Sequence, residues 1–317
     1  MFSRTPRWPC QTTCPGPGPG SYDLPRWPNL PRTPRTPRTP LLIPASVKLA
    51  GVKNLTETNP TLLTNKSIFK KSESDFAWTI ESPVTKLGSG AVGTVLLGRC
   101  GACSAAIKFS KEARFNPEIM QEAHLLKGLH HPNIVRLLHF ENAAGSAKAM
   151  LALELLGDNL LAIQENNKAT EIDFWEAARS LLAAAKYIHG KMIAHTDLTA
   201  SNVGARPSAY VWTLVVFDFD GAIQLEHADQ RVERKPAKML YWSPEAWANG
   251  SYSPLAEDIY STGQTLQEIV AASTLSCRAL VQFLDRMLCE EGRRLSAQEA
   301  FDIIWKMERG DAEWSRV

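Results

Sequence analysis

A glycine-rich stretch with an apolar run on each side limits what the middle of this 317-residue chain can fold into. Glycines stand at Gly88, Gly90 and Gly93, an apolar segment around Val84 precedes them, and Val95–Leu97 follows them. Glycine backbone approaches phosphate oxygens without a Cβ in the way. A dinucleotide-binding unit would place a helix directly after the glycines, whereas here a second strand follows. The pattern therefore predicts a glycine-rich β-hairpin suited to binding phosphate.

A lysine within an apolar, strand-like segment, Ala105–Phe109, is the next unusual feature. Because a buried ammonium group needs a partner, Lys108 either reaches solvent from an edge strand or pairs with an acid inside the fold. Downstream, Asn116-Pro117 predicts the start of a helix, with the asparagine as N-cap and the proline at the first helical position. Glu122 lies on this helix and can face Lys108, and the short separation of the two residues predicts a late helix start.

Two segments that contain acids follow in the second half of the chain. The first runs from His195 through Asp197 to Asn202, and the second is a buried-strand pattern, Leu214–Phe217, that ends in Asp218. An aspartate at the end of a strand commonly serves only to form a turn. Taken one at a time, these aspartates favour a structural role, and only the order of the segments along the chain points to chemistry.

This order, from the glycine hairpin through the strand lysine and the helix glutamate to the two aspartates, resembles the eukaryotic-type protein kinase superfamily. Tyr241–Glu245 resembles the Ala-Pro-Glu motif that closes the kinase activation segment, and Asp258–Gly263 resembles the helix that follows it. Arg294 matches the late arginine that pairs with the glutamate of the closing motif. The resemblance covers about residues 84–309 and implies an α+β, two-lobed protein kinase fold. A small β-rich N-terminal lobe would carry one key helix, and the larger C-terminal lobe would be mainly helical.

The resemblance implies an enzyme that uses ATP and Mg²⁺ to phosphorylate a protein hydroxyl group, with serine and threonine as the expected acceptors. In such a kinase Lys108, paired with Glu122, would hold the α- and β-phosphates, and Asp197 would orient the substrate hydroxyl and accept its proton. Asn202 and Asp218 would bind Mg²⁺. The residues that would contact the nucleotide are Gly88, Ser89, Gly90, Ala91, Val92, Gly93, Val95, Ala106, Lys108, Glu154 and Leu156.

Four positions of the catalytic loop and the metal-binding segments depart from the kinase pattern, and a fifth departs in the activation segment. Thr196 and Thr199 stand where the family carries an arginine and, in serine/threonine kinases, a lysine, so the catalytic loop lacks both usual basic residues. Asp220 replaces a glycine, and Gly204 replaces a leucine that packs beneath adenine. By motif alignment, Lys238 replaces a threonine that would contact the missing lysine, which leads to the hypothesis that Lys238 supplies the catalytic charge from the opposite side. The Asp-x-Thr loop resembles that of some herpesvirus protein kinases.

The expected activation segment contains no serine, threonine or tyrosine from Gly221 to Leu240. A phosphorylation switch needs an acceptor there and an arginine beside the catalytic aspartate, and the sequence offers neither. We therefore predict that phosphorylation of this segment does not switch the protein on. Besides Lys238, the segment carries the charged residues Glu226, Asp229, Glu233, Arg231, Arg234 and Lys235. These charges either order the segment through ion pairs or remain solvated.

Two other classes of protein stay open on sequence grounds. One is a pseudokinase that acts as a scaffold. Against it counts the retention of Lys108, Glu122, Asp197, Asn202 and Asp218. The other is a small-molecule phosphotransferase that resembles the aminoglycoside or choline kinases, whose catalytic segments carry a similar pattern of acids. Against it stand the closing motif and the helix after it, which in protein kinases build a platform for a protein substrate.

The first 44 residues have a composition that cannot form a core. They hold six arginines against one aspartate, a charge of +5, and 12 of the 20 prolines, including the repeat Pro31–Pro40. Such a segment is predicted to be a disordered, polyproline-like tail. It is either an inert basic tail, a docking arm for a partner or an anion, or a set of Thr-Pro phosphorylation sites at Thr33, Thr36 and Thr39.

The sequence also predicts how the chain is divided and where it resides. The predicted segments are a disordered Pro/Arg-rich tail (1–44), an unassigned N-terminal extension (45–82), the N-terminal lobe (83–153), the hinge and C-terminal lobe (154–309) and a C-terminal tail (310–317). No apolar run approaches the ~18–20 residues of a membrane span, and the first 20 residues lack the apolar core of a signal peptide. We expect an intracellular protein, cytoplasmic or nuclear (in the host cell if the chain is viral), with reduced cysteines and no membrane or specific nucleic-acid partner.

Overall fold

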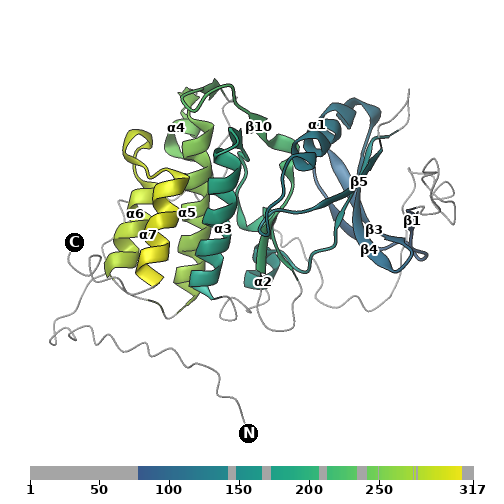
Figure 1. The fold of residues 1–317 in the computed structure, drawn as a ribbon, viewed down its shortest axis with the longest axis horizontal. Helices are drawn as coiled ribbons and strands as arrows, with labels where there is room; N and C mark the ends of the chain where they lie inside the picture. Colours follow the sequence, from purple (N-terminus) through teal and green to yellow (C-terminus); the bar gives the residue numbers. More distant parts are fainter. Residues whose placement is uncertain are drawn as a thin grey trace, which may run out of the picture. The chain divides into compact units, whose positions relative to one another are not determined.

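The computed structural model describes residues 78–141, 148–165, 173–206, 213–233, 241–248, 250–273, 275 and 278–308. The predicted N-terminal tail, nearly all of the unassigned extension and the C-terminal tail lie outside these residues, as does Lys238. Within the described part, the larger strands gather at one end and most of the long helices lie together at the other (Figure 1).

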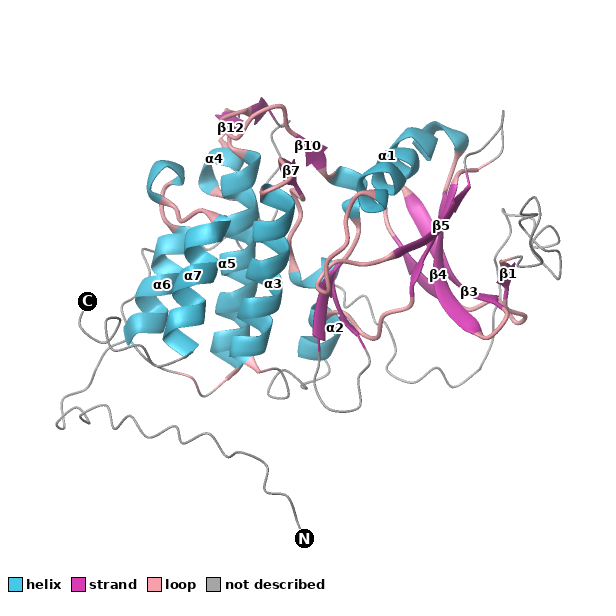
Figure 2. Ribbon diagram, in the orientation of Figure 1, coloured by secondary structure: helices cyan, strands magenta, loops and turns pink. Residues whose placement is uncertain are grey.

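The strand-rich end is a single antiparallel sheet of six strands (Figure 2). Its strands are β1 (Thr79–Ile80), β2 (Lys86–Ser89), β3 (Gly93–Cys100), β4 (Cys103–Ser110), β5 (Leu137–Glu141) and β6 (Met150–Glu154). The strand order is β1-β3-β4-β6-β5, and β2 pairs with β3 outside this path. The predicted glycine hairpin is confirmed as β2 and β3, and at its turn the Gly90 N–H donates to the Gly93 carbonyl at 3.0 Å.

Helix α1 (Asn116–Lys127) lies beside the sheet on the side nearer the other helices (Figure 1). Because it begins directly at Asn116, the expectation of a late start is wrong. Asn116 is also not the N-cap, since Phe115 takes that position. The Asn116 side-chain oxygen instead accepts the Ser110 hydroxyl at 2.6 Å and the Ala149 N–H at 2.8 Å. This oxygen therefore bonds to Ser110, the last residue of β4, and to Ala149, the residue before β6.

The larger part of the fold is mainly helical. Its helices are α2 (Leu160–Glu165), α3 (Phe174–His189), α4 (Pro244–Trp247), α5 (Pro254–Ala272), α6 (Arg278–Leu288) and α7 (Ala297–Glu308). Short strands pair as β7 (Ile193–Ala194) with β10 (Ile223–Gln224), β8 (Val203–Arg206) with β9 (Thr213–Val216), and β11 (Val232–Glu233) with β12 (Ser251–Tyr252). Helices α3, α5, α6 and α7 lie side by side (Figure 1). The small β-rich lobe with one key helix and the larger helical lobe are thus as the resemblance implied.

One hydrophobic core joins the two parts. Ile119 and Leu126 of α1 belong to the same buried cluster as Ile134, Phe174 of α3 and Leu266 of α5. Each fully buried side chain of this size contributes roughly 1.5–3 kcal/mol to folding. Since the cluster extends from α1 into the helices, the position of α1 depends on the packing of both parts.

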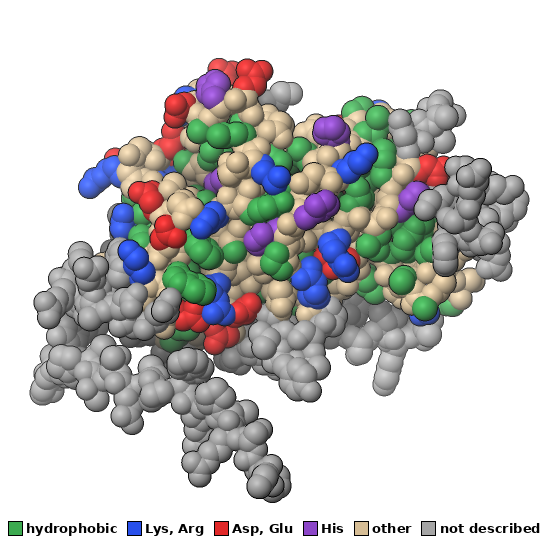
Figure 3. Space-filling model, viewed as in Figure 1, with side chains coloured by type: hydrophobic (Ala, Val, Ile, Leu, Met, Phe, Trp, Pro, Cys, Tyr) green, Lys and Arg blue, Asp and Glu red, His purple; other side chains and the backbone are tan. Residues whose placement is uncertain are grey.

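The exposed surface of the described residues is mixed in character. On the face drawn in Figure 3, Lys and Arg side chains lie among Asp, Glu and hydrophobic side chains. The described helices do not include one with the length and apolar character that a membrane span requires.

Candidate active site

A buried lysine meets three carboxylates at the side of the sheet that carries α1. Lys108 Nζ of β4 lies 2.7 Å from Glu122 Oε2, 2.5 Å from Asp218 Oδ1 and 3.1 Å from Asp220 Oδ2. Only 5% of Lys108 and none of Glu122 is exposed. Because β4 lies inside the sheet, between β3 and β6, the edge-strand interpretation of Lys108 is wrong. The ammonium group has the acidic partners that its burial requires.

These close contacts and their burial shift the pKa values of Lys108, Glu122 and Asp220. Burial alone would lower the pKa of Lys108, but the negative charges of its three partners outweigh burial and raise it. Burial raises the pKa of Glu122 to about 7, although the positive charge of Lys108 opposes the shift. Burial likewise raises the pKa of Asp220. With one ammonium group among three carboxylates, the centre carries an excess of acidic groups and attracts a cation.

Asp197 and Asn202 contact each other within the loop that follows β7. The Asn202 amide nitrogen donates to the Asp197 carbonyl at 3.0 Å and to its carboxylate at 2.7 Å. These bonds use the Asn202 amide nitrogen. The amide oxygen is of the atom type that binds Mg²⁺. Among the described residues, no three His, Cys, Asp or Glu side chains gather as a metal site on their own. Asn202 and Asp218 carry amide and carboxylate oxygens, which are the ligand types that Mg²⁺ accepts beside phosphate and water.

Helix α5 holds this loop through a buried aspartate. The carboxylate of Asp258, which is fully buried, accepts the His195 N–H at 2.8 Å and the Thr196 N–H at 2.7 Å. Thr196 has a φ of 65°, which is unfavourable for a β-branched residue. Its hydroxyl donates to the Gly221 carbonyl at 2.9 Å. The residue that replaces the usual arginine thus links the loop directly to the segment that begins at Asp218.

The segment from Asp218 to Ala222 is fixed from both sides. Phe219 is fully buried, and its ring lies edge-on to His195 with the ring centroids 4.6 Å apart. The Phe219 N–H donates to Glu122 Oε1 at 3.1 Å, and the Gln121 amide donates to the Ala222 carbonyl at 2.6 Å. Helix α1 therefore contacts this segment through two neighbouring residues, which brings Lys108, Glu122 and Asp218 together.

The glycine hairpin approaches the lysine strand closely at one position. A Cβ at Gly93 would lie 2.9 Å from the Phe109 carbonyl oxygen and 3.1 Å from Lys108 Cγ, so only glycine fits there without a shift of its neighbours. A Cβ at Gly88 or Gly90 would meet no atom within 4 Å. The space at these two glycines is therefore open, as a hairpin that covers phosphate would need. Gly88 and Ser89 end β2, Gly90, Ala91 and Val92 form the turn, and Gly93 and Val95 lie in β3.

Glu154, at the end of β6, was expected to contact the nucleotide, but its side chain binds two arginines instead. Its carboxylate accepts Arg206 Nη2 at 2.8 Å and the Arg136 N–H at 3.0 Å, and only 7% of the residue is exposed. Arg206 also donates to the Pro132 carbonyl at 2.6 Å. Any contact of Glu154 with a nucleotide is thus left to its main chain. Arg206 lies 52 residues after Glu154 in the sequence, so no local sequence pattern predicts this ion pair.

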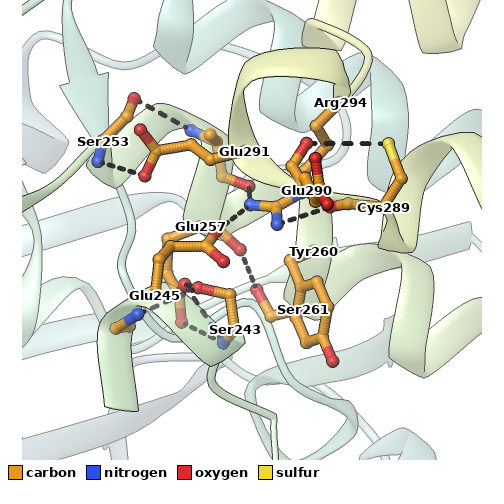
Figure 4. A network of polar contacts seen from close by, with 12 residues as sticks. Ser243, Glu245, Ser253, Glu257, Tyr260, Ser261, Cys289, Glu290, Glu291 and Arg294 are labelled. Carbon is orange, nitrogen blue, oxygen red and sulfur yellow. Dashed lines mark hydrogen bonds and ion pairs between the residues drawn. The ribbon is translucent and has the colours of Figure 1, made fainter. Parts of the chain in front are cut away.

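The closing motif is held by buried polar contacts (Figure 4). Ser243 caps α4 through the Ala246 N–H at 3.4 Å and donates its hydroxyl to Glu257 of α5. The Glu257 carboxylate also accepts the Ser243 N–H at 3.3 Å, and Glu257 is 1% exposed. The sequence interpretation missed Glu257. The available signal was Ser243 itself, because a hydroxyl at a buried position needs a partner.

Two further contacts fix the same motif. Arg294 Nη1 lies 2.6 Å from Glu245 Oε1, which confirms the predicted pair. Arg294 also donates to the Cys289 carbonyl at 2.8 Å and to the Ala256 carbonyl at 3.0 Å. The Tyr241 hydroxyl donates to the Glu268 carboxylate at 2.8 Å and 2.9 Å.

Arg294→Met is expected to lower the free energy of unfolding by about 3–5 kcal/mol, the usual loss when one member of a buried ion pair is removed. The reason is that Glu245 and two carbonyl oxygens lose their shared donor. Urea denaturation followed by circular dichroism measures the change. The exposed neighbour Arg293 provides the matched control, Arg293→Met. Equal stability of the two variants would contradict the structural role of Arg294.

The described part of the activation segment forms an ion pair, but not with the acids expected. Arg231 Nη1 lies 2.5 Å from Glu291 Oε1, and Arg231 Nη2 donates to the Ser251 carbonyl at 2.5 Å. The predicted partners within the segment are therefore wrong for Arg231. The pairing of β11 with β12, which sets Val232 opposite Tyr252, carries Arg231 to residues outside the segment. Arg234, Lys235 and Lys238 lie outside the described residues.

Comparison with known proteins agrees with this arrangement. The family model of the protein kinase domain matches residues 82–282, more than half of the chain, and the chain belongs to the protein kinase family. The α+β, two-lobed protein kinase fold expected from the sequence is thereby confirmed.

Three curated relatives are serine/threonine or other protein kinases by name. CBL-interacting serine/threonine-protein kinase 1 of Arabidopsis thaliana is 30% identical over 193 residues, 58% of this chain and 43% of the relative. Mitogen-activated protein kinase 14 of Xenopus laevis is 28% identical over 202 residues, 61% of this chain and 54% of the relative. Calcium/calmodulin-dependent protein kinase cmkA of Emericella nidulans is 28% identical over 180 residues, 56% of this chain and 43% of the relative. The chain spans about half the length of these relatives.

Proposed function

We propose that this protein is a serine/threonine kinase that transfers the γ-phosphoryl group of ATP to a protein hydroxyl in the presence of Mg²⁺. The observation that carries the proposal is the contact of Lys108 with Glu122, Asp218 and Asp220. These residues come from a strand, a helix and a loop that are distant in sequence. A buried cluster of this kind is costly to maintain. Its excess of acids suits Mg²⁺, and its ammonium group suits phosphate.

Each residue of the site has a role in this proposal. Lys108, oriented by Glu122, binds the α- and β-phosphates. Asn202 and Asp218 would hold Mg²⁺, which would supply positive charge beside the transferring phosphoryl group. Asp197, oriented by the Asn202 amide, aligns the substrate hydroxyl and accepts its proton. The glycine hairpin supplies backbone N–H groups to the phosphates. Lys238 supplies the positive charge that the loop at Thr199 lacks.

The closing motif favours a protein substrate over a small molecule. Ser243, Glu245 and Tyr241 are each held by a separate partner, Glu257, Arg294 and Glu268. Fixed in this way, the motif offers a rigid surface next to the loop that carries Asp197. A phosphotransferase acting on a small molecule has no need of such a surface. We also infer an intracellular location, with the Pro/Arg-rich tail as the contact to a partner.

The proposed activity is tested with purified protein, radiolabelled ATP, Mg²⁺ and a mixture of generic protein substrates. Phosphoamino-acid analysis of the labelled product is expected to show phosphoserine and phosphothreonine. Label found only on an aminoglycoside or on choline in parallel reactions would indicate a small-molecule phosphotransferase. Binding of ATP without any transfer would indicate a pseudokinase.

Phosphatase treatment of protein purified from cells is expected to leave the transfer rate unchanged. The described part of the activation segment is held by the ion pair of Arg231 with Glu291 and, at the first residue of the closing motif, by the hydrogen bond of Tyr241 to Glu268. Neither contact needs a phosphate group. Activity assays before and after treatment, with mass-spectrometric mapping of phosphates, make the measurement. A large loss of activity traced to a phosphate between residues 221 and 241 would contradict the prediction.

A further inference from the structure

Strands β3 and β4 form one hairpin (Figure 2), and a cysteine stands on each side of its turn. Cys100 is the last residue of β3, Cys103 is the first residue of β4, and the two are paired in register. The turn between them has only two residues. The first of these, Gly101, has a φ of 58°, a conformation that glycine adopts readily and that such tight turns require. The turn itself therefore sets the two cysteines opposite each other.

The pairing brings the two thiols within reach of each other. Residues paired directly across antiparallel strands have Cα atoms about 4.5–5.5 Å apart, which lies within the range of about 4.4–6.8 Å that a disulfide bond spans. Paired side chains also project from the same face of a sheet. Both cysteines are free thiols, and Cys103 is exposed while Cys100 is half-buried. A reagent in solution can therefore reach the pair.

The two thiols lie on the face of the sheet that is turned away from the lysine centre. Because side chains alternate along a strand, Cys103 shares its face with Ala105 and Ile107, whereas Lys108 projects from the other face. Ala105 and Ile107 belong to a small buried cluster that is separate from the main core. A reaction at the cysteines would therefore leave the space around Lys108 open.

Two cysteines separated by two residues could also be half of a zinc site. A structural zinc ion takes four protein ligands. Among the residues that the structure describes, no further His, Cys, Asp or Glu gathers with this pair into a metal site. A disulfide bond needs no third group. The surroundings of the pair therefore favour oxidation over metal binding.

We propose that Cys100 and Cys103 are a redox-active dithiol, which a small disulfide such as glutathione disulfide converts to an intramolecular disulfide bond. The thiolate of the more exposed Cys103 attacks one sulfur of the small disulfide, which forms a mixed disulfide and releases one small thiol. The Cys100 thiolate then attacks Cys103 Sγ, which forms the Cys100–Cys103 bond and releases the second small thiol. Two protein thiols are oxidised, one small disulfide is reduced, and the protons of the cysteines pass to the two released thiols.

The test incubates the full chain in buffers of increasing glutathione disulfide at constant total glutathione, alkylates the remaining thiols and digests the protein with trypsin. Cleavage after Arg99 and Lys108 leaves both cysteines in one peptide, residues 100–108. Mass spectrometry is expected to show this peptide two hydrogens lighter and without alkylation. Cys289, a half-buried thiol whose Sγ donates to the Arg286 carbonyl at 3.3 Å, is the internal control. It is expected to form no more than a mixed disulfide.

Single variants distinguish a reactive pair from two ordinary surface thiols. Cys100→Ser and Cys103→Ser each leave one thiol, which can form only a mixed disulfide with glutathione. Because the second step in the wild type is intramolecular, the pair is expected to be half-oxidised at a concentration of glutathione disulfide at least about tenfold lower than either variant requires.

Three results would overturn the proposal. The first is an equal requirement for glutathione disulfide in the wild type and both variants. The second is a disulfide that joins Cys100 or Cys103 to another cysteine of the chain in place of the bond between them. The third is a pair that stays reduced at every concentration tested, and protection of both thiols from alkylation by stoichiometric Zn²⁺ would then indicate a metal site instead.

Discussion

Asp218→Asn is expected to lower the rate of phosphoryl transfer by about a hundred- to a thousandfold, because a metal ion contributes several kcal/mol of charge stabilisation to such a reaction. Asparagine keeps the shape of the side chain but removes the charge that lies 2.5 Å from Lys108 and that would bind Mg²⁺. Initial rates with labelled ATP measure the loss. The midpoint of thermal unfolding is expected to remain near that of the wild type, since Asp218 lies at the edge of the core.

Asp220→Asn is the matched control for this prediction. Like Asp218→Asn, this variant removes a negative charge beside Lys108, since Asp220 Oδ2 lies 3.1 Å from Lys108 Nζ. Because the kinase pattern carries glycine at this position, a milder loss is expected. A rise in the Mg²⁺ concentration needed for half-maximal rate is expected for Asp218→Asn in particular. A folded Asp218→Asn protein that turns over at the wild-type rate would show that the metal assignment is wrong.

Lys238→Met is expected to lower the rate of transfer by about 10²- to 10³-fold, the usual effect of removing one group that stabilises transition-state charge. The loop from His195 to Asn202 contains no lysine or arginine. Within it, the Thr199 hydroxyl is engaged with the Ser201 hydroxyl at 2.7 Å. A lysine or arginine beside the transferring phosphoryl group would therefore come from another segment, and Lys238 is the residue that motif alignment offers.

The loss in this variant is expected in kcat, with a smaller change in KM for ATP, because the charge acts on the transition state. Lys235→Met, three positions away in the same segment, serves as the control for a general loss of positive charge. A near-normal rate for Lys238→Met, or equal losses for both variants, would reject the exchange of roles between positions 199 and 238.

The sequence predicts the lysine centre because burial of an ammonium group demands an acid. Lys108 lies in an apolar strand, and Glu122 on the next helix is a suitable partner. Chain order, rather than geometry, identified Asp197 and Asn202, and the structure shows their hydrogen bond. The fold follows from the same order of motifs, since each motif marks a strand, a helix or a turn whose place in the kinase fold is known.

What the sequence does not predict are contacts between polar residues that are distant along the chain. Asn116 has the local pattern of an N-cap, but Phe115 takes that position and the Asn116 side-chain oxygen accepts the Ser110 hydroxyl and the Ala149 N–H. Arg231 is surrounded in sequence by acids, yet a strand pairing carries it to Glu291. In each case the local pattern predicts a partner nearby in the sequence, whereas the observed partner comes from a distant segment that the fold brings close.

The carboxylate of Glu122 divides its two oxygens between Lys108 and the Phe219 N–H. Gln121, the neighbouring residue, bonds the Ala222 carbonyl. A displacement of α1 would break all three bonds together, so the position of the helix and that of the segment after Asp218 are coupled. A molecule that binds α1 better in one of its positions then shifts the population of the assembled lysine centre by its difference in affinity. By the same linkage, nucleotide bound at Lys108, as proposed, would strengthen the binding of that molecule to α1 by an equal factor.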